Sequence, residues 1–134
     1  HSPYTMLLSS LDIEMRPVHP NGAIQKEPIS VYEDYNREGG MLITTEQEGA
    51  SVAETLGEDS VVMLRGHGAV VVGSSVEEVL TKSLKLEYNS EMLYKQSVVG
   101  DPWYPPEDLV GQNVDNMLSE GQITKTLDYY FSEL

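Results

Sequence analysis

Few side chains of the types that carry chemistry occur in this sequence, which has three histidines and no cysteine. His67 stands out because it lies between Gly66 and Gly68. The two glycines let the backbone bend sharply, so that the imidazole can project from the end of a strand. An imidazole can bind a divalent metal ion or transfer a proton near neutral pH. The position fits such a site, and it fits equally well a plain hairpin turn whose histidine is hydrogen-bonded locally.

The other two histidines, taken singly, have the pattern of ordinary surface residues. His1 directly precedes Ser2 and Pro3, which suit the N-cap and the first turn of a helix. His19 lies in a segment with two prolines and an Asn-Gly pair, residues 16–22, which predicts a loop with a turn and no regular element. Spacing alone therefore does not define a metal site.

Two hydrophobic runs, residues 61–64 and 69–73, flank the turn that contains His67. Their hydrophobicity is continuous rather than alternating, which predicts two strands that are covered on both faces. Such strands occur in a sheet that lies between layers of helices. We therefore expect His67 at the end of a buried sheet in the middle of the fold.

Capping signals and helical spacing predict the helices around this sheet. Thr44 and Gln47 have the spacing of a capping box, and Gly57 would end the helix that follows. Ser75 and Glu78 form a second such box before a long helix packed on two sides. The expected helices are one directly after Ser2, then about 45–56, 76–98, 107–118 and 122–133, with at most one short strand in 23–40.

The charge of the chain restricts its partners. It has 22 acidic and 8 basic residues, a formal net charge of −14, which repels nucleic-acid phosphates and anionic lipids. No hydrophobic run approaches the roughly 18 residues that span a bilayer. The 134 residues suffice for one domain, and the lack of cysteine fits a cytoplasmic protein. We expect a cytoplasmic protein that binds neither nucleic acid nor membrane.

Two motifs resemble the class II aldolase and adducin family. Residues 61–73, followed by the sequence Ser-Val-Glu-Glu-Val at 75–79, form the first motif. The second is His-Ser-Pro-Tyr at residues 1–4, which resembles the second half of the family pattern His-Thr-His-Ser-Pro-Tyr. The resemblance implies a three-layer α/β fold whose central, mostly antiparallel or mixed sheet is covered by helices on both faces. Residues 1–134 would be the carboxy-terminal portion of a single such domain, which lacks its amino-terminal part.

The resemblance also implies a metal site. His1 would be the second metal ligand and His67 the third, while the first histidine of the motif, the catalytic glutamate and the phosphate-binding loops of the family would lie upstream. The expected cofactor is a divalent metal, zinc or manganese, with iron as a further option. Histidine ligands leave open positions at which the metal can polarise an oxygen of a small-molecule substrate.

The implied activity is that of a lyase that cleaves a carbon–carbon bond. The reaction would be aldol cleavage of a sugar phosphate or decarboxylation of a hydroxylated aromatic acid, through a metal-stabilised enolate. Residues 17–19, 42–45, 65–68 and 70–73 most resemble the decarboxylase branch of the family. The alternatives are another metalloenzyme of the fold, such as an epimerase, dehydratase or oxygenase, and a non-catalytic adducin-like interaction module.

Such a reaction needs a proton donor or acceptor besides the metal. His19 is the first candidate, because its reference pKa is near neutral and it matches a histidine of the decarboxylase branch; a solvated loop histidine is the alternative. Tyr130 and Tyr129 resemble by position a tail tyrosine that closes over the site in sugar-phosphate members, although helix packing explains them equally well. Tyr32 and Tyr35 are further candidates.

The resemblance has two more implications, for substrate binding and for assembly. Arg65, beside His67, could bind an anionic substrate. The alternative is that Arg65 is a surface residue that forms an ion pair with one of the many carboxylates. The active sites of the family are built at subunit contacts. We therefore expect a homo-oligomer, and a tetramer in particular.

Overall fold

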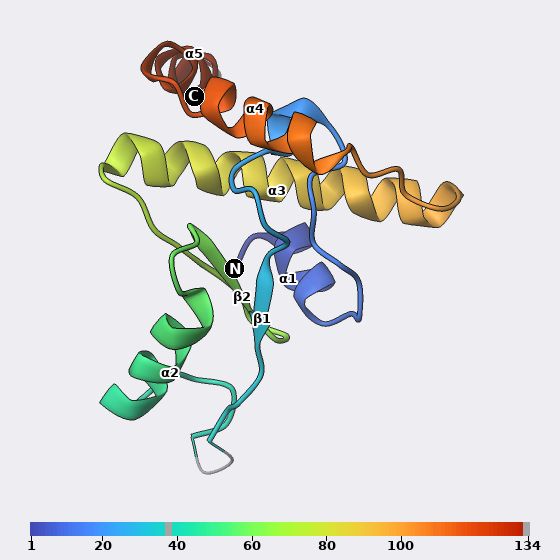
Figure 1. Cartoon of the computed structure of the whole chain (residues 1–134). Coiled ribbons are helices and arrows are strands. Elements are labelled where there is room, and N and C mark those ends of the chain that lie inside the picture. The colour runs from blue at the N-terminus through green and yellow to red at the C-terminus, as the bar shows by residue number, and fades with distance from the viewer. Residues whose placement is uncertain (37–38, 133–134) are drawn as a thin grey trace.

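The computed structural model describes residues 1–36 and 39–132. Its helices are α1 (Pro3–Ser9), α2 (Glu46–Leu56), α3 (Val76–Val99), α4 (Glu107–Met117) and α5 (Glu120–Ser132). Its strands are β1 (Ser30–Tyr32), β2 (Val61–Leu64) and β3 (Gly68–Val71), and a short 3-10 helix, η1 (Pro20–Gly22), precedes β1. Helix α3 crosses the molecule, with α4 and α5 on one side and the sheet and α1 on the other (Figure 1).

The described sheet is mixed and has the strand order β1-β2-β3. Strand β1 pairs in parallel with β2, with Val31 opposite Met63. Strand β2 pairs antiparallel with β3, with Val62 opposite Val70, through the turn that carries His67. The expectation of an α/β fold with a mixed sheet is confirmed.

Successive side chains of β2 enter two different cores, as the two-residue period of a strand requires. Val61 and Met63 pack with Leu8 of α1 and Leu86 of α3. Val62 and Leu64 face the other way and pack in a cluster with Val52 of α2. Helices therefore cover both faces of the sheet, as expected.

Strand β3 is less covered than the sequence predicts. All four residues of β2 are buried, whereas in β3 only Gly68 is buried and the other three are half-buried. Among the described residues β3 has β2 as its one partner, so it forms an edge of the sheet. Ala69 and Val71 pack against one core and Val70 against the other, so β3 is partly covered on both faces. The prediction that both strands are covered on both faces is thus correct for β2 and correct in part for β3.

The helices have the predicted positions, with small corrections at their ends. Helix α2 is capped by Thr45 and Glu48, one residue after the predicted pair, and Glu48 accepts hydrogen bonds from the Thr45 and Thr44 backbone N–H groups at 2.9 Å each. The bond from the Thr44 backbone, followed by that from the Thr45 hydroxyl, lowers the pKa of Glu48 to about 2. Gly57 ends the helix with φ of +57°.

Helix α5 begins two residues before the predicted start, and residue 133, the predicted end, is outside the described residues.

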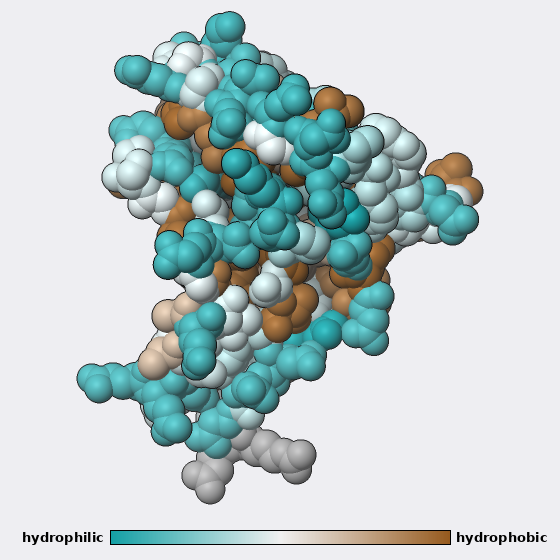
Figure 2. All heavy atoms as spheres, in the orientation of Figure 1, coloured by the Kyte–Doolittle hydropathy of each residue, from teal (hydrophilic) through white to brown (hydrophobic). Residues whose placement is uncertain are grey.

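Figure 2 shows a mostly hydrophilic face with a hydrophobic tip at the end of α3, where Val98 and Val99 are exposed. None of the described helices combines the length and the apolar character that a membrane-spanning helix needs.

The loop before η1 is fixed to α3 by Asn89. This side chain is buried; its Oδ1 accepts from the Val18 N–H at 3.0 Å and its Nδ2 donates to the Arg16 carbonyl at 2.9 Å. A Cβ atom at Gly22 would lie only 2.1 Å from the same Oδ1, so the backbone of η1 packs directly on the asparagine. The prediction of no regular element in residues 16–22 is therefore wrong for Pro20–Gly22, because a partner far along the chain orders this segment.

Replacing Asn89 by alanine tests this attachment. The change leaves the buried Val18 N–H without an acceptor, so we expect the free energy of unfolding to fall by about 2 kcal/mol. Urea titrations followed by circular dichroism measure it. Gln112→Ala, which removes an exposed amide from α4, is the control, and equal stabilities of the two variants would contradict the assignment.

Candidate functional site

The structure brings His1 and His67 together, although 66 positions separate them in the sequence. Their Nε2 atoms lie 3.0 Å apart, and the ring centroids are separated by 4.5 Å at an interplanar angle of 50°. Two nitrogen atoms bound to one zinc ion at about 2.0–2.1 Å can be at most about 4.2 Å apart. The facing Nε2 atoms thus fit two ligands of a single divalent ion.

The turn between β2 and β3 holds His67 against the amino terminus of α1. Its backbone N–H donates to the Leu64 carbonyl at 2.9 Å. Gly66 and Gly68 both have positive φ, +72° and +137°, which side-chain-bearing residues rarely adopt. A Cβ atom at Gly68 would also lie 3.3 Å from the backbone nitrogen of His1. Gly68 is therefore required both by the turn and by the close approach of His1.

His1 is positioned through α1, whose first turn is held by a carboxylate of α3. Ser2 occupies the predicted N-cap position, but its side chain makes no capping hydrogen bond. Instead, Glu87 accepts the N–H groups of Tyr4 and Thr5, both at 2.9 Å, and the Thr5 hydroxyl at 2.8 Å. An anionic acceptor is favourable at a helix amino terminus, where N–H groups lack intrahelical partners. Nothing local in the sequence distinguishes Glu87 from an exposed helix glutamate, so sequence patterns do not predict its role.

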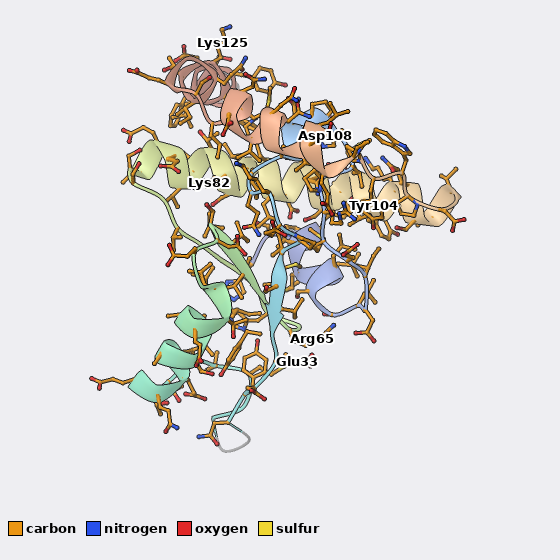
Figure 3. The ribbon with its side chains drawn as sticks, in the orientation of Figure 1. Glu33, Arg65, Lys82, Tyr104, Asp108 and Lys125 are labelled. Carbon is orange, nitrogen blue, oxygen red and sulfur yellow. The ribbon has the colours of Figure 1, made fainter. Side chains whose placement is uncertain are left out.

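Arg65, next to His67, is engaged by carboxylates. Its guanidinium contacts Glu33 at 2.9 and 3.0 Å and Asp12 at 3.2 Å, and it donates to the Leu11 carbonyl at 2.9 Å. Figure 3 shows Arg65 and Glu33 side by side. These bonds attach the turn to the residues that follow β1 and α1. The binding of substrate by Arg65 stays a prediction.

Tyr130 lies on α5, which is on the other side of α3 from the sheet and α1 (Figure 1), and His19 contacts Tyr88, which lines the same hollow as Tyr130. The His19 ring packs edge-on against the Tyr88 ring of α3, with the ring centroids 4.9 Å apart. The buried Nε2 of His19 has no hydrogen-bond partner among the described residues. Burial lowers the pKa of His19, and the charge of Lys85 lowers it further, so the imidazole is neutral at pH 7. Tyr130 lines a hollow between α3 and α5. The predicted metal ligands, His1 and His67, and the predicted proton-transfer residues, His19 and Tyr130, therefore do not converge within one chain.

Two other predicted candidates have structural hydrogen bonds. The Tyr32 hydroxyl donates to the Asp34 carbonyl at 2.7 Å, and the Tyr35 hydroxyl donates to the Arg65 carbonyl at 3.0 Å. Burial raises the pKa of Tyr35, with a further contribution from Tyr32. Both hydroxyls thus hold the end of β1 and the turn in place.

Next to the histidine pair, His67 forms part of the wall of a hollow of about 520 Å³. The other walls are mainly hydrophobic and come from the loop before α2 and from the sheet; among the lining residues are Met41, Leu42, Ile43, Thr44, Leu64 and Val70. The size is that of a small-molecule site. Residues from the segments 42–45 and 70–73, which resemble the decarboxylase branch of the family, contribute to this wall.

Within residues 1–36 and 39–132, no group of three or more His, Asp or Glu side chains converges as a metal site. Catalytic zinc sites generally have three protein ligands. The two imidazoles fit two of these ligands, and a complete site needs at least one more.

The sequence model for the Class II Aldolase and Adducin N-terminal domain matches residues 1–94, which include both histidines of the pair. The chain belongs to the class II aldolase and adducin family. Members are typically enzymes that bind small molecules and are often oligomeric, and class II aldolases generally use a divalent metal such as zinc.

Solved structures show the same fold. An aldolase II superfamily protein from Pseudomonas syringae is 17% identical over 99% of this chain, with a TM-score of 0.76. An L-fuculose 1-phosphate aldolase is 15% identical over 87% of the chain, with a TM-score of 0.72. YgbL from Escherichia coli, described as a candidate aldolase/epimerase/decarboxylase, is 20% identical over 85%, with a TM-score of 0.64.

The chain spans about half the length of these structures, 53%, 52% and 54% respectively. No curated protein sequence matches it. The resemblance inferred from the two motifs is thus confirmed at the level of family and fold.

Replacing Glu87 by alanine tests how α1, which carries His1, is held in place. Because three donors at the start of α1 lose their acceptor, we expect the free energy of unfolding to fall by about 2 kcal/mol. Glu91→Ala, one turn later on α3, removes only an ion pair with Lys95 and should cost below about 0.5 kcal/mol. Chemical denaturation of both variants gives the comparison, and a similar loss in the two would argue against the role of Glu87.

Proposed function

We propose that this chain is part of a divalent-metal-dependent lyase that cleaves a carbon–carbon bond, with His1 and His67 as metal ligands. The observation that supports it is the 3.0 Å separation of two facing Nε2 atoms on the two residues that the family motifs single out. Zinc or manganese is the proposed metal, with iron as a further option. We also infer that residues 1–134 are the carboxy-terminal portion of one class II aldolase-like domain, because residues 1–4 resemble the second half of the family's histidine motif.

In this proposal the protein's contribution is to hold two imidazoles in a fixed orientation. The metal ion, when bound, supplies positive charge that stabilises negative charge on a substrate oxygen as the carbon–carbon bond breaks. Gly66 and Gly68 hold His67 in its turn, and Glu87 holds α1 and thereby His1. Such fixed ligands need no rearrangement during the reaction.

The hollow beside His67 would take the body of the substrate. Its walls are mainly hydrophobic side chains such as Met41, Leu42 and Ile43, which favour a flat apolar body over a hydrated sugar. This observation favours decarboxylation of a hydroxylated aromatic acid. Aldol cleavage of a sugar phosphate is the second candidate, and the structural similarity to L-fuculose 1-phosphate aldolase supports it.

Arg65 is the proposed contact for an anionic substrate group. One of its partners, Asp12, has a side chain that is 96% exposed, so this ion pair is weak. A substrate carboxylate could replace Asp12, while the bonds to Glu33 and the Leu11 carbonyl keep the guanidinium in position.

His19 and Tyr130 are the proposed proton-transfer groups, and they would act on the site of a neighbouring subunit. Tyr130 belongs to α5, on the opposite side of α3 from the sheet and α1 of its own chain (Figure 1), and His19 contacts Tyr88 in the lining of the same hollow. His19 is neutral at pH 7 because burial lowers its pKa, so it would accept a proton before it donates one. A homotetramer is the proposed assembly, which the frequent oligomerisation of the family supports.

The ligand role of His67 is tested by metal analysis of the full-length protein. We expect about one equivalent of zinc or manganese in the wild type and at least tenfold weaker metal binding in His67→Ala, because one imidazole is lost. Elemental analysis after dialysis, with titration calorimetry, measures both. Retention of one tightly bound equivalent in the variant would refute the assignment.

The role of His19 is tested with His19→Gln in the full-length protein. Loss of a proton-transfer group should reduce turnover about 100-fold or more, while the metal content stays unchanged. Turnover is assayed against a panel of hydroxyaromatic acids and ketose phosphates. Unchanged turnover would remove His19 from the mechanism, and loss of metal would make it a ligand instead.

A further inference from the structure

The hollow between α3 and α5 gathers positive charge in an otherwise acidic protein. It has a volume of about 440 Å³ and is lined by Lys85, Lys125, Asn21, Gln122 and several tyrosines. The chain has 22 acidic and only 8 basic residues, yet no Asp or Glu occurs among the described lining residues. In Figure 3, Lys125 lies on α5 at the opposite end of the molecule from Arg65 and Glu33.

Lys85 is buried and has no counter-ion among the described residues. The residue is 8% exposed, and the only described hydrogen-bond partner of its ammonium is the Met117 sulfur, at 3.9 Å. Lys82, three positions earlier on α3, is buried to a similar degree but pairs with Glu78 and donates to the Ser60 hydroxyl at 2.8 Å. A buried ammonium is costly unless it is paired and hydrogen-bonded. Of these two buried lysines, only Lys82 has a carboxylate partner among the described residues.

A second unpartnered polar group lies beside the same hollow. The buried Nε2 of His19 has no described hydrogen-bond partner, and its ring contacts Tyr88, which lines the hollow. Burial lowers the pKa of Lys85, and the charge of Lys85 helps to lower the pKa of His19. A negative charge in the hollow would oppose both effects and supply the missing counter-ion.

We propose that this hollow binds a small organic molecule through an oxyanion, a phosphate or a carboxylate group. Lys85 forms the buried ion pair, Lys125 contributes charge from the exposed rim, and the amides of Asn21 and Gln122 donate hydrogen bonds. The volume exceeds that of an inorganic ion and lies in the range of small-molecule sites. Tyr88 supplies a flat wall for the body of the ligand.

Tyr130, one of the proposed proton-transfer groups of the lyase, also lines this hollow, so the oxyanion site is assigned to Lys85 and Lys125 rather than to the whole lining. Neither lysine has a role in the proposed lyase mechanism, and the hollow is lined mainly by residues of α3 and α5, with α5 on the opposite side of α3 from the sheet and α1 (Figure 1). Binding at the hollow should therefore persist when the metal site is removed.

Titration calorimetry on the full-length protein tests the proposal, with inorganic phosphate and benzoate as separate probes in HEPES buffer. We expect at least one probe to bind with a Kd below 10 mM, and the tighter probe identifies the class of oxyanion. Lys85→Met should weaken that binding at least tenfold. Lys95→Met, which removes the same charge from an exposed position of α3, should change it less than twofold.

Two further variants keep the result decisive. Lys125→Met alters only an exposed position, so this variant should fold normally and weaken binding of the probe at least twofold. If Lys85→Met does not fold, the binding measured with Lys125→Met tests the proposal. His67→Ala should bind the probe as the wild type does. The proposal is overturned if neither probe binds below 10 mM, if the folded Lys85 and Lys125 variants behave like Lys95→Met, or if His67→Ala abolishes binding.

Discussion

The contact between the Glu87 carboxylate and the first turn of α1 determines where His1 lies. Helix α1 has seven residues, too few to be stable alone, and its amino-terminal N–H groups need acceptors. Glu87 supplies these acceptors from the middle of α3. On the other side of the pair, the tight turn between β2 and β3 fixes His67. The geometry of the candidate metal site follows from these two constraints together.

Helix α3 is the element that connects the parts of the molecule. Glu87 binds α1, Leu86 and Leu93 enter the core against the sheet, and Asn89 fixes the loop before η1. Lys85 faces the hollow that α5 closes. The buried polar residues of this helix are therefore as important for the arrangement as its hydrophobic ones, because each one binds a segment that is distant in the sequence.

Local patterns predicted most elements, and the errors arise where a distant partner decides the structure. The hydrophobic runs around His67 gave β2 and β3, and helical spacing gave the positions of α2 to α5. The cap of α2 was misplaced by one residue because Thr44 and Thr45 both suit that position. Glu87 and Asn89 were missed because their partners lie more than 70 positions away. The pairing of His1 with His67 followed from the family motifs, since neither histidine carries a local signal for the other.

We expect the imidazoles of His67 and His1 to reach their positions at different stages of folding. A short turn joins β2 to β3, so His67 reaches its place through contacts that are local in the sequence. His1 arrives only when α1 docks on α3, through contacts 82 and 83 positions apart, and the closure of such a long loop carries a larger entropic cost. Local opening of α1 then separates the two imidazoles while the sheet and α3 remain folded. We therefore expect the candidate metal site to form after the turn that carries His67 and to open together with α1.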